Sequence, residues 1–275
     1  MTPLVSPNCV MRWAVSLGSL ILFGTATAYS QQGPLPPPGY VMTWSDEFSG
    51  TALNTSKWRV RYPGMRDGAM VTAESVSLNG QGQLLLTTFV RDGLVHTGMI
   101  GTQQTFQQKY GYFEARIKFQ KSQGHHGAFW LQSPTYGLFL DNPEESGTEI
   151  DITEFFGSGR SDKGMFSTVW WNPYSNPSSI KIQPNLGPFL STSSRRNVRE
   201  MSDKFHVYGL LWTPERYVFY INGIEMGRIE QSVSQVNEYI VLSLLSSSWE
   251  RGRLPLQSLP ESMTVDYVRV YAPQP

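Results

Sequence analysis

The hydrophobic runs of this chain are short, and Gly, Asn and Pro turn signals separate them. The clearest runs, rich in β-branched and aromatic residues, lie at 83–88, 112–119, 217–221 and 263–271. Asn222-Gly223 after the third run is a strong hairpin signal. No run of about twelve residues keeps a helical period. The pattern therefore predicts an all-β sandwich or barrel.

Composition narrows the class of protein further. The chain has 275 residues, a formal net charge of zero and 13% aromatic residues. A sandwich of this length commonly forms one domain. Nucleic-acid-binding proteins usually carry a basic excess, so we expect no nucleic-acid partner, and the charge gives no general attraction to acidic membranes. Most aromatic rings should belong to the core.

Residues 1–30 have the features of a secretory signal peptide. Arg12 precedes an apolar run at 13–24, and small residues at 25–28 offer an A-x-A type cleavage site. The run is short for a membrane span, which leaves a retained anchor as the alternative. We expect a secreted or periplasmic protein with no membrane association after signal removal. Cys9 would leave with the signal, so no disulfide, Cys nucleophile or Cys-ligated zinc is expected.

The rest of the chain reads as a short linker and one domain. Residues 31–39 are rich in Pro and Gly, and residues 40–275 show no break in composition. Met11 is an alternative start, because residues before it add nothing that a signal requires. Three longer loops, candidates for binding, are expected at 133–147, 172–194 and 246–260.

Two polar groups in or near loops have competing interpretations. Arg195, Arg196 and Arg199 form either a solvated basic turn or a contact for an anionic polysaccharide such as a sulfated galactan. His125 and His126 have no ligand partners at metal spacing and are interpreted as a pair in a loop.

The segment 147–157 carries the candidate chemistry. On a strand, Glu149 and Asp151 share one face, but strict alternation would put Thr153 beside them instead of Glu154. One extra residue, a β-bulge, returns Glu154 to the acidic face. Three carboxylates on one surface then suggest acid and nucleophile chemistry, and the alternative is a solvated acidic face.

Strand geometry is compatible with a retaining glycosidase. Glu149 and Glu154 are about four strand steps apart, which places their backbones about 13 Å from each other. If each side chain leans inward by about 4 Å, the carboxyl groups end about 5 Å apart. Mutual repulsion would raise one carboxyl pKa and give a protonated acid beside an ionised nucleophile. Asp151 between them can hold the nucleophile by a hydrogen bond.

The segment 149–154 fits the pattern E-x-D-x-x-E, and with its flanks the chain resembles glycoside hydrolase family 16, in the laminarinase, agarase and carrageenase-like branch. The supporting segments are 44–48, 53–58, 110–116, 128–131, 205–208, 211–214 and 265–271. The resemblance covers roughly residues 40–272. It implies a concanavalin-like β-jelly-roll sandwich of two antiparallel sheets with a concave substrate cleft.

The resemblance also implies roles for the carboxylates and for three neighbours. Glu149 matches the nucleophile, Glu154 the acid and base, and Asp151 the assisting carboxylate. Glu114 and Arg116 match cleft residues that bind sugar hydroxyls, with an ion pair between them as the alternative. Trp130 matches a cleft aromatic suited to stacking on a pyranose ring, with core packing as the alternative.

Two further expectations follow from the resemblance. Family members often bind a structural calcium, for which Asp266 and the region of Glu47 are candidates. Laminarinase-like members commonly carry a His where this chain has Trp170. We therefore expect Trp170 or Trp171 to form part of a sugar subsite, with a stacking group in place of a hydrogen-bonding one.

The sequence therefore predicts a monomeric, secreted, retaining endo-glycosidase that needs no cofactor for its chemistry. Its substrate would be a β-linked polysaccharide, with β-1,3-glucan, mixed-linkage glucan and galactan all open. A transglycosylase with the same site and a non-catalytic polysaccharide-binding protein on the same fold are the alternatives.

Overall fold

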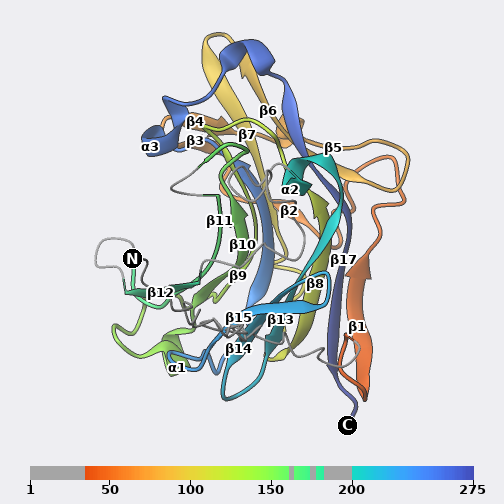
Figure 1. The fold of residues 1–275 in the computed structure, drawn as a ribbon, viewed down its shortest axis with the longest axis vertical. Helices are drawn as coiled ribbons and strands as arrows, with labels where there is room; N and C mark the ends of the chain where they lie inside the picture. The colour runs from red at the N-terminus through yellow and green to blue at the C-terminus, as the bar shows by residue number, and fades with distance from the viewer. Residues whose placement is uncertain (1–34, 161–163, 174–177, 183–199) are drawn as a thin grey trace, which may run out of the picture. The chain divides into compact units, whose positions relative to one another are not determined.

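The computed structural model describes residues 35–160, 164–173, 178–182 and 200–275 (Figure 1). β-strand is by far the commonest regular structure among the described residues, which confirms the all-β prediction. Their helical segments are short: α1 (Pro143–Ser146), α2 (Glu200–Asp203), α3 (Ser248–Arg251), η1 (Ala73–Ser75) and η2 (Leu256–Ser258). None of these is long and apolar enough to cross a membrane. The expected signal peptide, linker residues 31–34 and Arg195, Arg196 and Arg199 lie outside the described residues.

One antiparallel sheet, called here the β17 sheet, is organised around the C-terminal strand. Its strands are β1 (Tyr40–Asp46), β5 (Val76–Leu78), β6 (Leu84–Arg91), β8 (Gly111–Lys118), β13 (His206–Trp212), β14 (Tyr217–Ile221), β15 (Ile224–Ile229) and β17 (Glu261–Pro273). One edge of β17 pairs with β6 and then with β1, while β5 pairs with β6. Its other edge pairs with β8, from which the sheet continues through β13 and β14 to β15.

A second sheet, called here the β10 sheet, contains the carboxylate strand. Its strands are β2 (Arg59–Val60), β7 (Leu94–Gly101), β9 (His126–Gln132), β10 (Glu149–Phe155), β11 (Met165–Trp170), β12 (Ser179–Ile182) and β16 (Tyr239–Leu245). They lie in the order β2–β7–β16–β9–β10–β11–β12, all antiparallel. The hairpin of β6 and β7 joins the two sheets, and β3 (Gly64–Arg66) and β4 (Ala69–Val71) extend the edge of β7.

The main hydrophobic core lies between the two sheets. Ala115 and Ile117 of β8 share one buried cluster with Phe129 and Leu131 of β9. Because successive side chains of a strand point to opposite faces, the residues between these face away from the core. The core therefore leaves the other face of the β10 sheet available for a site, as expected for a jelly-roll sandwich.

The turns and loops mostly follow the sequence signals. Asn222 and Gly223 have φ values of 50° and 78°, the left-handed conformation that a tight hairpin turn requires. Helices α1 and α3 occur in two of the three expected loops. The third expected loop, at 172–194, is wrong in part, because it contains strand β12, which pairs with the outer edge of β11. An edge strand of four residues is too short for its alternation of polar and apolar residues to be recognised in the sequence.

Candidate active site

Strand β10 contains the predicted bulge. Asp151 pairs with Trp130 of β9, but the next pair joins Thr153 to Phe129, so β10 has one extra residue there. The pairing with β11 shifts at the same place. The bulge moves Glu154 onto the face that Glu149 and Asp151 already share.

All three carboxylates therefore lie on the face of the β10 sheet that is opposite the core. Their partners on β9 are alternate residues, from position 132 to position 128, which share one face of that strand. Glu149, Asp151 and Glu154 line one cavity of about 320 Å³. Glu149 and Asp151 are only 6% and 5% exposed. The bulged strand thus brings three acidic groups to one largely desolvated site.

Asp151 lies in an environment that favours its protonated form. Burial raises the pKa of Asp151 well above its ordinary value, and the charges of Glu154 and Glu149 raise it further. Trp170 opposes this shift by donating its indole N–H to Asp151 Oδ2 at 3.1 Å. Trp170 lines the cavity, and its indole N–H bonds to Asp151, whereas the sequence suggested only a stacking role for this ring.

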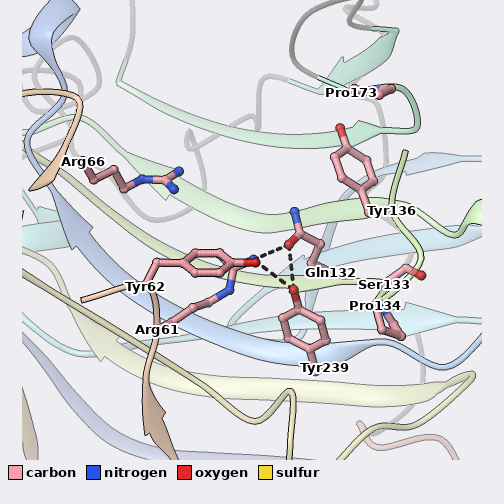
Figure 2. A pocket seen from close by; sticks show the side chains of 9 residues that line it. All are labelled: Arg61, Tyr62, Arg66, Gln132, Ser133, Pro134, Tyr136, Pro173 and Tyr239. Carbon is pink, nitrogen blue, oxygen red and sulfur yellow. Dashed lines mark hydrogen bonds between the residues drawn. The ribbon is translucent and has the colours of Figure 1, made fainter. Parts of the chain in front are cut away.

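Glu149 has a fixed neighbour at the end of β9. Gln132 donates from Nε2 to Glu149 Oε2 at 2.7 Å, and Gln132 Oε1 accepts from the Tyr239 hydroxyl at 2.7 Å. Gln132 and Tyr239 belong to the lining of a second cavity, of about 300 Å³, which Figure 2 shows. Arg66 lines both cavities, so the second cavity adjoins the acidic one.

The aromatic lining of the acidic cavity includes two residues that the sequence did not suggest. Trp130 lines the cavity and donates its indole N–H to Ser243 Oγ at 3.1 Å, and it is only 5% exposed because it also packs in a small buried cluster. Trp249 of α3 and His126 also line the cavity, with ring centroids 5.5 Å apart. The interpretation of His126 as a loop residue is wrong, because it begins β9. The sequence did contain a signal for His126, because alternate residues of a strand share one face and His126 is four positions before Trp130.

Glu114 and Arg116 lie elsewhere, so their expected place in the cleft is wrong. Both belong to β8 in the β17 sheet, and Ala115 between them faces the core. Their side chains therefore point to the face of that sheet away from the core. Arg116 forms an ion pair with Asp266 at 2.7 Å, and burial raises the pKa of Glu114 while Arg269 opposes the shift.

Trp171 also lies apart from the two cavities, since it lines neither of them. It follows the last residue of β11, and its backbone N–H donates to the Ser178 carbonyl oxygen at 3.1 Å. Of the two tryptophans expected at a sugar subsite, the structure brings only Trp170 to the carboxylates.

The side chains of the two candidate calcium residues are both paired with arginine. Asp266 pairs with Arg116, and Glu47 receives two hydrogen bonds from Arg269, both at 2.9 Å. Calcium takes about six to eight oxygen ligands, which can include backbone carbonyls, so the calcium site stays a prediction. Across the residues that the structure describes, no group of three His, Cys, Asp or Glu could hold a metal ion.

Comparison with known proteins agrees with this geometry. Residues 40–273 match the GH16 domain of beta-porphyranases A–D. The chain is 25% identical over 248 residues to the keratan-sulfate endo-1,4-beta-galactosidase of Sphingobacterium multivorum, covering 84% of this chain but 55% of that protein. It is 25% identical over 236 residues to beta-porphyranase B of Zobellia galactanivorans, covering 74% and 76%.

The fold has close counterparts among solved structures. The endo-beta-1,3-glucanase of Pyrococcus furiosus superposes with a TM-score of 0.65 at 23% identity, covering 85% of this chain and 94% of that one. The match of residues 40–273 covers nearly the whole described domain. The chain therefore belongs to glycoside hydrolase family 16.

Proposed function

We propose that this protein is a retaining endo-glycosidase that hydrolyses a β-linked polysaccharide at the cavity of Glu149, Asp151 and Glu154. The observation that carries the proposal is the bulge in β10. It makes three carboxylates point toward one desolvated cavity. This arrangement supports two carboxyl groups acting in turn as nucleophile and acid.

The proposed reaction is a double displacement. Glu149 attacks the anomeric carbon while Glu154 protonates the leaving glycosidic oxygen, which gives a glycosyl-enzyme ester. Glu154 then removes a proton from water, and this water displaces Glu149 and releases the sugar. Asp151, which favours a bound proton, donates a hydrogen bond to a neighbouring carboxylate and keeps charge from accumulating between them.

We further propose that the substrate is an anionic galactan. Among the residues that the structure describes, none forms a hydrogen bond or ion pair with the Arg66 side chain, which lines both cavities. A free guanidinium beside the site suits a sulfate or carboxylate group on the polymer. The names of the two relatives point the same way, since they refer to keratan sulfate and porphyran.

The remaining expectations about the protein's setting also stay proposals. We propose that it acts as a monomer outside the cytoplasm, after removal of residues 1–30, and that its chemistry needs no cofactor. Two carboxyl groups supply both the acid and the nucleophile, so the proposed reaction requires no further reagent than water.

The central experiment measures new reducing ends. Purified protein is incubated with porphyran, κ-carrageenan, keratan sulfate, agarose, laminarin and lichenan, alongside the variants Glu149→Gln and Glu154→Gln. Glu144→Gln, an exposed glutamate of α1, is the matched control. We expect wild type and control to cleave at least one polymer and both cavity variants to lose at least about a thousandfold in kcat.

The outcomes separate the proposal from its alternatives. Full activity of Glu149→Gln would overturn the assigned nucleophile. Binding of every polymer without new reducing ends would favour a non-catalytic binding protein. Products longer than the starting polymer would show a transglycosylase.

The role of Arg66 has its own test. We expect Arg66→Met to raise KM about tenfold on a sulfated polymer, since one charge-assisted contact is worth about 1.5–3 kcal/mol. The same variant should leave KM unchanged on the chemically desulfated polymer. Arg91→Met, at an exposed ion pair with Glu74, is the control. Equal effects on both polymers would contradict recognition of an anionic group.

A further inference from the structure

Arg61 is a buried arginine close to the candidate nucleophile. It is 3% exposed, and its guanidinium lies over the rings of Tyr62, Trp130 and Tyr239, at 4.4, 4.9 and 5.5 Å from the centroids. Within the described part of the chain, no recorded ion pair joins it to a carboxylate. Burying a charge without a partner costs free energy, so the Arg61 guanidinium needs other interactions that offset this cost.

The compensating interactions lead from Arg61 to Glu149. Arg61 Nη2 donates to Gln132 Oε1 and, at 2.9 Å, to the Tyr239 hydroxyl. That hydroxyl donates to the same Gln132 oxygen, as the dashed lines of Figure 2 show. The other end of the amide, Gln132 Nε2, donates to Glu149 Oε2. Arg61 is thus two hydrogen bonds from the carboxylate.

This order of donors fixes which way the Gln132 amide faces. A guanidinium has donors only, so the group that faces Arg61 must be the amide oxygen. The amide nitrogen must then face Glu149, where it can donate to an ionised carboxylate. A tyrosine hydroxyl alone could not impose this order, because it can either donate or accept. Without Arg61 the amide could turn its oxygen toward Glu149 and repel it.

We propose that Arg61 is a positioning residue that acts through Gln132 to hold Glu149 ionised and correctly oriented for attack. The inference rests on the proposed role of Glu149 as nucleophile. The β-sheet makes the relay rigid, because Gln132 pairs directly with Glu149 on one side and with Tyr239 on the other. Arg61 therefore affects the chemical step more than the binding of substrate.

The test compares Arg61→Met, Gln132→Leu and the double variant on the polymer of the panel that wild type cleaves fastest. For each single variant we expect kcat to fall at least about tenfold with KM within about twofold. The acid-side midpoint of kcat/KM should rise by about one pH unit, because the ionised carboxylate loses its donor. The double variant should fall no further than Gln132→Leu alone.

The controls make the outcome specific. Arg59→Met removes an exposed arginine two residues away and should match wild type in rate and pH profile. Gln132→Leu nearly keeps the side-chain volume, so its shifted pH profile carries the test if Arg61→Met does not fold. An unchanged acid midpoint in the variants, or losses that multiply in the double variant, would overturn the inference. Activity of Glu149→Gln would instead overturn the proposed function itself.

Discussion

Glu238 is a buried carboxyl group that should make the stability of this domain depend on pH. It is completely buried, and its Oε1 accepts from the Thr148 backbone N–H at 3.0 Å and from the Thr148 hydroxyl at 2.9 Å. Burial raises the pKa of Glu238 to about 8, against the opposing hydrogen bonds from Ser234 and Thr148 and with an added contribution from the charge of Glu149. Glu238 therefore keeps its proton in the folded protein at neutral pH.

The sign and size of the effect follow from the two titrations. In the unfolded chain a glutamate loses its proton near pH 4.5, whereas Glu238 in the fold keeps it until about pH 8. Between these values the native state binds more protons, so its contribution to stability is lost as pH rises. At about 1.4 kcal/mol per unit over roughly 3.5 units, the loss amounts to about 5 kcal/mol.

Glu238→Gln should remove this dependence while it keeps the shape of the side chain and an acceptor for Thr148. We expect wild type and variant to differ little in free energy of unfolding near pH 4.5. The variant should become progressively more stable than wild type up to about pH 8, with a constant difference above that pH. Urea unfolding in half-unit steps from pH 4.5 to pH 9 measures this difference directly.

Glu230→Gln, at an exposed glutamate, is the matched control, and its difference from wild type should be flat across the same range. A flat difference for Glu238→Gln as well would refute the reasoning. It would mean that Glu238 ionises in the fold in the usual range for a glutamate.

Three other changes have outcomes that the contacts predict. Trp170→Phe removes the donor to Asp151 but keeps an aromatic ring, so kcat should fall about tenfold with little change in KM, whereas Trp171→Phe should match wild type. Trp249→Ala removes an exposed ring that lines the cavity. In a Glu149→Gln background it should weaken polymer binding about tenfold by calorimetry, and unchanged affinity would show that the ring does not contact the polymer. Arg160→Met breaks an ion pair with Glu250 at 2.6 Å, in which the two side chains are 3% and 2% exposed. It should lower the free energy of unfolding by about 3–5 kcal/mol. Arg216→Met, at an exposed pair, should lower it by less than about 1 kcal/mol.

The strands and the acidic face could be predicted from the sequence because both depend on local periodicity. The alternation at 263–271 and the turn at Asn222-Gly223 became β17 and the β14–β15 hairpin. The bulge was predictable for the same reason, since only one extra residue aligns Glu154 with Glu149.

The rest of the site depends on which sheet a strand joins, and a single sequence does not contain that information. Glu114 and Arg116 alternate as cleft residues would, but β8 lies in the opposite sheet. Arg61 follows the two-residue strand β2, Arg66 ends the three-residue strand β3, and Trp249 belongs to the four-residue helix α3. Segments this short have no distinctive period in the sequence. The long-range pairs that bring Gln132 next to Tyr239 could be known only from the fold.

The stereochemistry of the first product tests the central claim most directly. Proton NMR recorded within minutes of adding enzyme to the cleaved polymer distinguishes the anomers of the new reducing end before they equilibrate. Double displacement at Glu149 predicts that the β-anomer is released first and the α-anomer appears only by mutarotation. Initial release of the α-anomer would contradict the account, because it requires direct attack by water and leaves Glu149 without its proposed role.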